Sequence, residues 1–253
     1  MSLSKILLRG LSIAVLMTAF LVSAASCGGE SEPTPAAPDP TPTPALSDVL
    51  TKAGERMAAM MSAKFGMVDE KQTGAKFFET TFKSMEAEVK APDSFRMLVD
   101  VISPAFGFIE IEMMAVGDQA FMKFSKDAPW GPLPVDGVPF NFRGLGGTFS
   151  DVIHMVRDGD GAITGSESVL GSQTIRAEGT VQSEQLSNLI TDVDSGHTLT
   201  LTMWIDEDDH SLRQLRILGQ LYDEDGPETS RLVTINALDV PVEINLPELG
   251  SGQ

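Results

Sequence analysis

Apolar residues recur at every second position in several long segments of this chain, and this alternation constrains the fold more than any other feature. In FRMLVDVI (95–102), GFIEIEMMAVG (107–117) and HTLTLTMWID (197–206), most apolar side chains alternate with polar ones. Successive side chains of a β-strand point to opposite faces of a sheet, so each segment has one apolar face. Gly117-Asp118 is typical of a tight hairpin turn. The pattern predicts consecutive antiparallel strands that bury one face.

Two segments have a helical period instead. In LSDVLTKAGERMAAMM the apolar residues are three and four positions apart, which places its three methionines on one helix face. A second helix is predicted from Thr148 to Gly159, with Phe149 and Ile153 pointing inward. Helices inserted among antiparallel strands indicate an α+β domain.

The segment Ala128–Gly147 separates the two halves of this pattern. It contains four prolines and five glycines, so we predict no regular element there. A loop of this length in a compact domain is often functional, for example as a lid. The alternative is a surface loop that the side chains of Trp130, Phe140 and Phe142 hold against the domain. The sequence pattern does not decide between a lid and such a loop.

The N-terminus has the features of an export signal. Lys5 and Arg9 precede an apolar run of about a dozen residues, too short for the roughly 20 of a membrane-spanning helix. Small residues then lead to Cys27, the single cysteine of the chain, which excludes an intramolecular disulfide. We predict a lipoprotein signal peptide over residues 1–26 and acylation of Cys27. An ordinary signal cleaved near Ala25, which would leave a free thiol, is the alternative.

Residues 27–45 comprise the acylated cysteine and a tether rich in proline and threonine. Polyproline II extends by about 3.1 Å per residue, so the tether could span on the order of 50 Å. Residues 46–253 are enough for one sizeable core, and we predict a single domain there.

The strong negative charge restricts the possible partners. The net charge is −18, and removal of Lys5 and Arg9 with the signal makes it −20. Such a body repels nucleic acid and anionic headgroups, so we expect attachment to a membrane through the acyl group and no nucleic-acid binding.

The residues that usually carry catalysis or bind metals do not form a recognisable pattern. His154, His197 and His210 have no histidine or cysteine partner at metal-ligand spacing. The acidic stretch RDGDGAITG breaks the pattern of alternating oxygen ligands of a calcium loop at Ala162. We interpret the second acidic stretch, Asp206–Asp209, as a solvated hairpin turn. No nucleotide-binding or serine-hydrolase motif is present. We therefore predict no catalytic residue, no metal site and no cofactor, and we do not expect an enzyme.

Methionine is abundant, with thirteen residues in the chain against one tyrosine and two tryptophans. Its unbranched, polarisable side chain suits surfaces that accept varied apolar partners, although it also fills irregular cores. Together with the one-faced strands, this predicts a compliant apolar cavity. The candidate lining residues are Met57, Met60, Met61, Phe95, Met97, Val99, Ile109, Ile111, Met113, Met122, Phe124, Phe149, Ile153, Leu201 and Met203.

The chain resembles the mycobacterial LppX/LprA/LprF/LprG-type lipoprotein family. The resemblance rests on GDQAFMKFSKDAPW, LTLTMWIDEDDHSLRQLRI and LVTINALDVPVEINLP, and on the lipobox-like Ala24-Ala25-Ser26-Cys27. It implies a LolA/LolB-like fold, a curved antiparallel β half-barrel with helices packed on its concave face, which encloses an apolar cavity. In that family the cavity carries lipids or lipoglycans across the cell envelope.

These observations lead to two hypotheses about function. The first is an extracytoplasmic lipoprotein, anchored to the cell membrane by its N-terminal lipid, that binds an apolar lipid, glycolipid or lipoglycan and carries or presents it without catalysis. Its expected partners are that lipid, the membrane and an envelope transport protein, and we expect a monomer. The alternative is an envelope protein-interaction or sensor module on the same fold without lipid cargo, with a filled core and an exposed apolar patch.

The acylation of Cys27 gives a direct prediction. The variant Cys27→Ser should lose membrane attachment, because two or three acyl chains supply the durable anchor. Cell fractionation followed by intact-protein mass spectrometry should find the variant in the soluble fraction without an added lipid mass. A variant that remains membrane-bound would contradict the predicted anchor.

Overall fold

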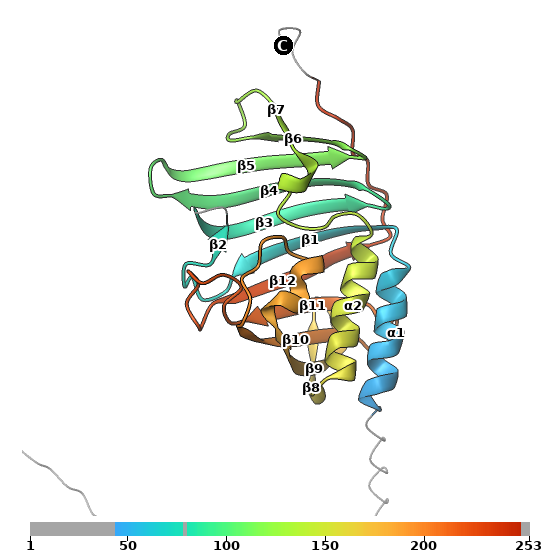
Figure 1. The fold of residues 1–253 in the computed structure, drawn as a ribbon. Helices are drawn as coiled ribbons and strands as arrows, with labels where there is room; N and C mark the ends of the chain where they lie inside the picture. The colour runs from blue at the N-terminus through green and yellow to red at the C-terminus, as the bar shows by residue number, and fades with distance from the viewer. Residues whose placement is uncertain (1–43, 78–79, 249–253) are drawn as a thin grey trace, which may run out of the picture. The chain divides into compact units, whose positions relative to one another are not determined.

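The structure is a computed structural model that describes residues 44–77 and 80–248 (Figure 1). The predicted signal peptide, Cys27 and nearly all of the tether lie outside these residues. The first described element is the helix α1, Leu46–Ala58. No helix in the described part of the chain is long and apolar enough to cross a membrane.

The described strands form one antiparallel sheet. Its order is β7-β6-β5-β4-β3-β1-β12-β11-β10-β9-β8, and the short strand β2 pairs with β3. Neighbouring strands of each half are mostly consecutive in the chain, and β1 pairs with β12 where the halves meet. The strands are β1 Ser62–Asp69, β2 Lys76–Phe77, β3 Thr80–Lys90, β4 Ser94–Ser103, β5 Gly107–Val116, β6 Gln119–Lys123, β7 Gly131–Leu133, β8 Ala162–Val169, β9 Ser172–Gln182, β10 Thr198–Asp206, β11 Leu212–Leu218 and β12 Ser230–Leu238.

The period-two segments are strands, as predicted. Phe95, Met97 and Val99 of β4 are at most 1% exposed, whereas Arg96 and Leu98 between them face the other side of the sheet. The turn at Gly117 joins β5 to β6, and Val116 pairs with Gln119 across it. The sheet is curved, and both helices lie on its concave face (Figure 1). The predicted α+β fold with a curved antiparallel sheet is confirmed.

The helices α1 and α2 (Leu145–Asp158) lie side by side and antiparallel over the half of the sheet that contains β9 to β12 (Figure 1). Their contact depends on small residues. A Cβ atom at Gly146 would lie 2.4 Å from the carbonyl oxygen of Met57, and one at Gly54 would lie 2.3 Å from Nε2 of His154. The two backbones therefore approach closely because glycine occupies both positions.

The helix boundaries differ from the predicted ones. The first helix ends at Ala58, so Met60 and Met61 lie beyond it, and Met61 is 65% exposed. The second helix begins at Leu145, one turn before the predicted start at Thr148. The prediction missed this turn because glycines at its start resemble a loop, although packing against the first helix requires one of them, Gly146.

The segment Ala128–Gly147 is more regular than predicted. It contains β7 and a 3₁₀ turn, η1 (Val135–Gly137), before α2 begins. A second 3₁₀ turn, η2 (Ser183–Asn188), follows β9. The rings of Phe140 and Phe142 lie 5.0 Å and 4.7 Å from the ring of Phe95, so this segment packs on the concave face of the sheet.

The two adjacent glycines at the start of α2 allow a matched test of the helix contact. Gly146→Ala should lower the free energy of unfolding by about 1–3 kcal/mol, because the methyl group would overlap the carbonyl of Met57. Gly147→Ala has nothing within 4 Å of the added carbon and should be neutral or stabilising by up to about 1 kcal/mol. Urea denaturation of the two variants measures the difference, and equal effects would contradict the close packing.

Candidate functional site

The concave face carries an open groove beyond the part that the helices cover. Its volume is about 740 Å³. The strand register explains its composition, because Ile111 and Met113 share the inward parity of β5 and Met113 pairs with Met122 of β6. None of the described residues that line this apolar groove is charged. Its lining residues are Thr80, Ser103, Phe106, Ile109, Ile111, Met113, Met122, Phe124, Leu133 and Gly137.

Large aromatic side chains lie exposed at this groove. Phe106 in the β4–β5 turn is 82% exposed, and Phe124 directly after β6 is 59% exposed. Phe108, near the same turn, is 62% exposed. Soluble proteins seldom cluster large apolar side chains at the surface unless the surface binds something. The groove and its aromatic residues are therefore the main candidate binding surface.

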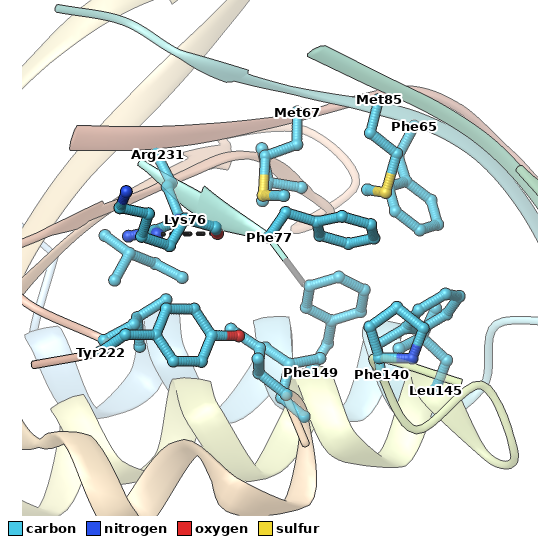
Figure 2. Close-up of a pocket in the computed structure, with 16 residues that line it drawn as sticks. Phe65, Met67, Lys76, Phe77, Met85, Phe140, Leu145, Phe149, Tyr222 and Arg231 are labelled. Atoms are coloured by element: carbon cyan, nitrogen blue, oxygen red, sulfur yellow. Dashed lines mark hydrogen bonds between the residues drawn. The ribbon is translucent and has the colours of Figure 1, made fainter. Parts of the chain in front are cut away.

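A second, much smaller pocket lies between the sheet and the helices, and we call it the inner pocket (Figure 2). Its volume is about 80 Å³. Phe65, Met67 and Met85 project into it from the sheet, and Phe140 and Phe149 from the opposite side (Figure 2). One end is polar, because Lys76, Tyr222 and Arg231 also line it.

The segment that follows β7 separates the two spaces. Leu133 and Gly137 line the groove, whereas Pro139 and Phe140 line the inner pocket. Phe140 also forms an antiparallel β-bridge to Ile190, which lines the inner pocket as well. This segment is therefore a packed partition on the concave face.

The polar end of the inner pocket is organised by a buried ion pair. Nη2 of Arg231 lies 2.9 Å from Oδ1 of Asp225, with side-chain exposures of 3% and 0%. The Asp225 carboxylate also accepts hydrogen bonds from the backbone N–H groups of Lys76, Leu221 and Tyr222. The pair thus holds the chain before β12 against β2.

The fifteen candidate lining residues lie in four environments: the groove, the inner pocket, the surface and the core. Five line the groove: Ile109, Ile111, Met113, Met122 and Phe124. Phe149 lines the inner pocket, and Met61 lies at the surface. The other eight pack in the core: Met57, Met60, Phe95, Met97, Val99, Ile153, Leu201 and Met203.

Sequence reasoning missed several residues at these sites. Leu133, Phe106 and Thr80 lie in or next to turns, where no periodicity identifies the side that faces the groove. Arg231 gave one weak signal, because it lies two residues before Val233 in a strand whose inward positions are otherwise apolar. A charged residue at an inward position of an otherwise apolar strand face can be recognised in the sequence as an exception to the alternation.

The histidines and acidic clusters have structural surroundings. No group of three potential metal ligands occurs in the described residues. His154 packs against Gly54 between the helices, and His197 lies 2.9 Å from Asp223. Asp206, which we predicted to lie in a solvated turn, is instead buried and paired with Arg213 at 2.7 Å.

Known proteins share this fold and part of this sequence. The LppX_LprAFG lipoprotein family matches residues 149–244. Crystalline LprF from Mycobacterium bovis has a TM-score of 0.62 and 16% identity, covering 82% of this chain and 99% of that one. The crystal structure of LppX from Mycobacterium tuberculosis has a TM-score of 0.53 and 16% sequence identity, and the match covers 79% of this chain and 98% of LppX. No curated protein matches the sequence. The resemblance predicted from the sequence is thus confirmed.

The buried Asp206 predicts a pH dependence of stability. Burial opposes ionisation of Asp206, but hydrogen bonds from Arg213 and two backbone N–H groups outweigh it and lower its pKa to about 2. Because the folded-state pKa lies below the unfolded value of 3.8, the stabilisation is present above about pH 4 and is lost as the pH falls through 2.

Asp206→Asn should therefore lower the free energy of unfolding by about 2 kcal/mol at pH 7 and by much less at pH 2. Urea denaturation at both pH values measures this. Glu207→Gln, an exposed residue of the same turn, is the control and should change stability by less than about 0.5 kcal/mol. Equal losses for Asp206→Asn at both pH values would contradict the assignment.

Proposed function

We propose that this chain, which resembles the LppX_LprAFG lipoprotein family over residues 149–244, binds an apolar lipid or glycolipid in the apolar groove and carries or presents it at the cell envelope. The observation that carries the proposal is the groove itself. It is a space of about 740 Å³ on the concave face, and its lining residues in the described part of the chain carry no charge.

The dimensions support binding in the groove rather than in the inner pocket. Small-molecule sites usually measure about 300–1,000 Å³, and the groove falls within this range. The inner pocket of about 80 Å³ is far smaller. A lipid chain can gain about 25 cal/mol for each Å² of apolar surface removed from water, so an apolar groove supplies affinity without polar contacts.

The groove chemistry favours binding without catalysis. Among the described residues, its lining contains no histidine, cysteine, lysine or carboxylate, and the polar side chains there are the hydroxyls of Thr80 and Ser103. A hydrolase needs a nucleophile with an adjacent base, and this lining supplies no base. The proposal is therefore a binding and transfer role.

The N-terminal sequence supports a location at the outer side of a membrane. Cys27 follows a signal-like segment, and the tether leads directly to the start of α1 at Leu46. An acylated Cys27 would hold the domain near the membrane from which it collects or to which it delivers lipid. A transport partner and a monomeric state remain predictions from the resemblance.

One observation favours the alternative, a protein-interaction or sensor module. The exposed rings of Phe106 and Phe124 at the groove form the kind of aromatic surface that proteins also recognise. This module would bind a stoichiometric protein through these rings and would purify without lipid. Whether the purified protein carries a lipid or a bound protein therefore distinguishes the two functions.

Two exposed apolar residues provide a matched test of the groove. Phe124→Gln should reduce the amount of lipid that co-purifies from membranes at least threefold, because it places an amide in the groove lining. Met61→Gln removes a side chain of similar exposure, 65% against 59%, outside the groove and should change nothing. Native mass spectrometry of both variants and the unmodified protein measures the lipid content. Absence of lipid from all three would overturn the proposed function.

A further inference from the structure

The inner pocket contains a charged residue on a face that is otherwise apolar. Arg231 has the same parity along β12 as Val233 and Ile235, which are buried on the concave side. It is 2% exposed and lines the pocket. Burying a guanidinium is costly, so its hydrogen-bonding groups should all have partners unless the position serves a ligand.

Only part of this guanidinium is paired. Nη2 donates to Asp225 and, at 3.3 Å, to the carbonyl oxygen of Lys76. Nη1 is buried and has no hydrogen-bond partner among the described residues. The Asp225 carboxylate cannot easily supply one, because it already accepts three backbone hydrogen bonds besides that from Arg231.

A second unused donor lies at the same end of the pocket. The hydroxyl of Tyr222 points toward Phe149 into the pocket (Figure 2), and none of the hydrogen bonds in the described part of the chain involves it. The guanidinium carbon of Arg231 lies 5.6 Å from the centre of the Tyr222 ring. Burial raises the pKa of Tyr222, so the hydroxyl keeps its proton and remains a donor at neutral pH.

The charges around the two donors restrict the ligand further. The charge of Arg231 is matched by that of Asp225, and Tyr222 is neutral. Asp192 and Asp194 lie close enough to act on the Tyr222 hydroxyl electrostatically. Two donors without excess positive charge favour an uncharged acceptor oxygen over an anion, although Lys76 at the pocket edge provides one cation.

We propose that the polar end of the inner pocket binds the carbonyl oxygen of an acyl group, with the hydroxyl of Tyr222 and Nη1 of Arg231 as donors. Among acyl carbonyls, the neighbouring acids favour an ester over a free carboxylate. The pocket has about half the volume of a 150 Å³ apolar cavity that holds benzene, so it accommodates the carbonyl and a few carbons. This inference rests on the proposed lipid-binding function and names the ligand group that the inner pocket recognises.

Tyr222 is the single tyrosine of the chain, so it provides an isolated spectroscopic signal. Protein labelled with ¹³C at the tyrosine ζ carbon should give one resonance, which moves when the hydroxyl donates a hydrogen bond. After removal of co-purified lipid, methyl octanoate should shift this resonance in a saturable way. Nonane, which has a similar length and no acceptor, should shift it far less.

The variant Tyr222→Phe preserves the ring and removes the donor. It should weaken binding of methyl octanoate about 3- to 10-fold, as expected for one hydrogen bond, and leave binding of nonane unchanged. Calorimetric titration measures both affinities. Because the hydroxyl has no hydrogen-bond partner among residues 44–77 and 80–248, this variant should also retain the thermal stability of the unmodified protein, so a loss of affinity cannot come from misfolding.

Each other outcome overturns a defined part of the inference. A tenfold tighter binding of octanoate than of methyl octanoate would assign the site to a free carboxylate and overturn the ester. Equal shifts with the ester and nonane, or a crystal structure with water alone on both donors, would overturn the carbonyl site.

A groove variant separates this inference from the proposed function. Phe124→Gln should lower co-purified lipid but leave the Tyr222 shift with methyl octanoate unchanged, because Phe124 does not line the inner pocket. Lipid in the groove without any Tyr222 shift would reject the carbonyl site alone. A Tyr222 shift in a protein that never carries lipid would reject the proposed function alone.

Discussion

The pairing of β1 with β12 is the interaction on which the rest of the domain depends. It runs from Ala63 opposite Leu238 to Asp69 opposite Arg231 and joins strands from the two ends of the domain. Contacts between such distant segments carry a large loop-closure cost, so they form only with the support of the neighbouring strands. This ladder combines two meanders into one curved face, and its register places Arg231 at the polar end of the inner pocket.

The helices cover only part of that face. They lie over β9 to β12, whereas inward residues of β5 and β6 line the groove (Figure 1). Inward parity alone therefore does not distinguish core from binding surface. Met203 of β10 and Met113 of β5 are both buried core residues, yet Met113 lines the groove and Met203 does not. The position of the helix pair produces this difference.

The local charge at the inner pocket differs from the charge of the whole chain. A net charge of −18 argues against anionic ligands in general, whereas Arg231 and Lys76 bring cations to one end of a nearly apolar pocket. Asp225 offsets the first of these because its carboxylate lies 2.9 Å away. The site consequently provides hydrogen-bond donors with little excess charge, which fits an uncharged polar group of a lipid better than an ionic one.

The sequence by itself determined the strands, the antiparallel order and the family resemblance, because period-two alternation and hairpin turns are local properties of the chain. It also identified five residues of the groove, since their parity follows from that alternation. Only the tertiary structure decided that Phe95, Leu201 and most other candidates are core, that Met61 is outside, and that residues 128–147 form a partition. The reason is physical. The strand determines to which face of the sheet a side chain points, but elements from distant parts of the chain determine which residues pack against that side chain.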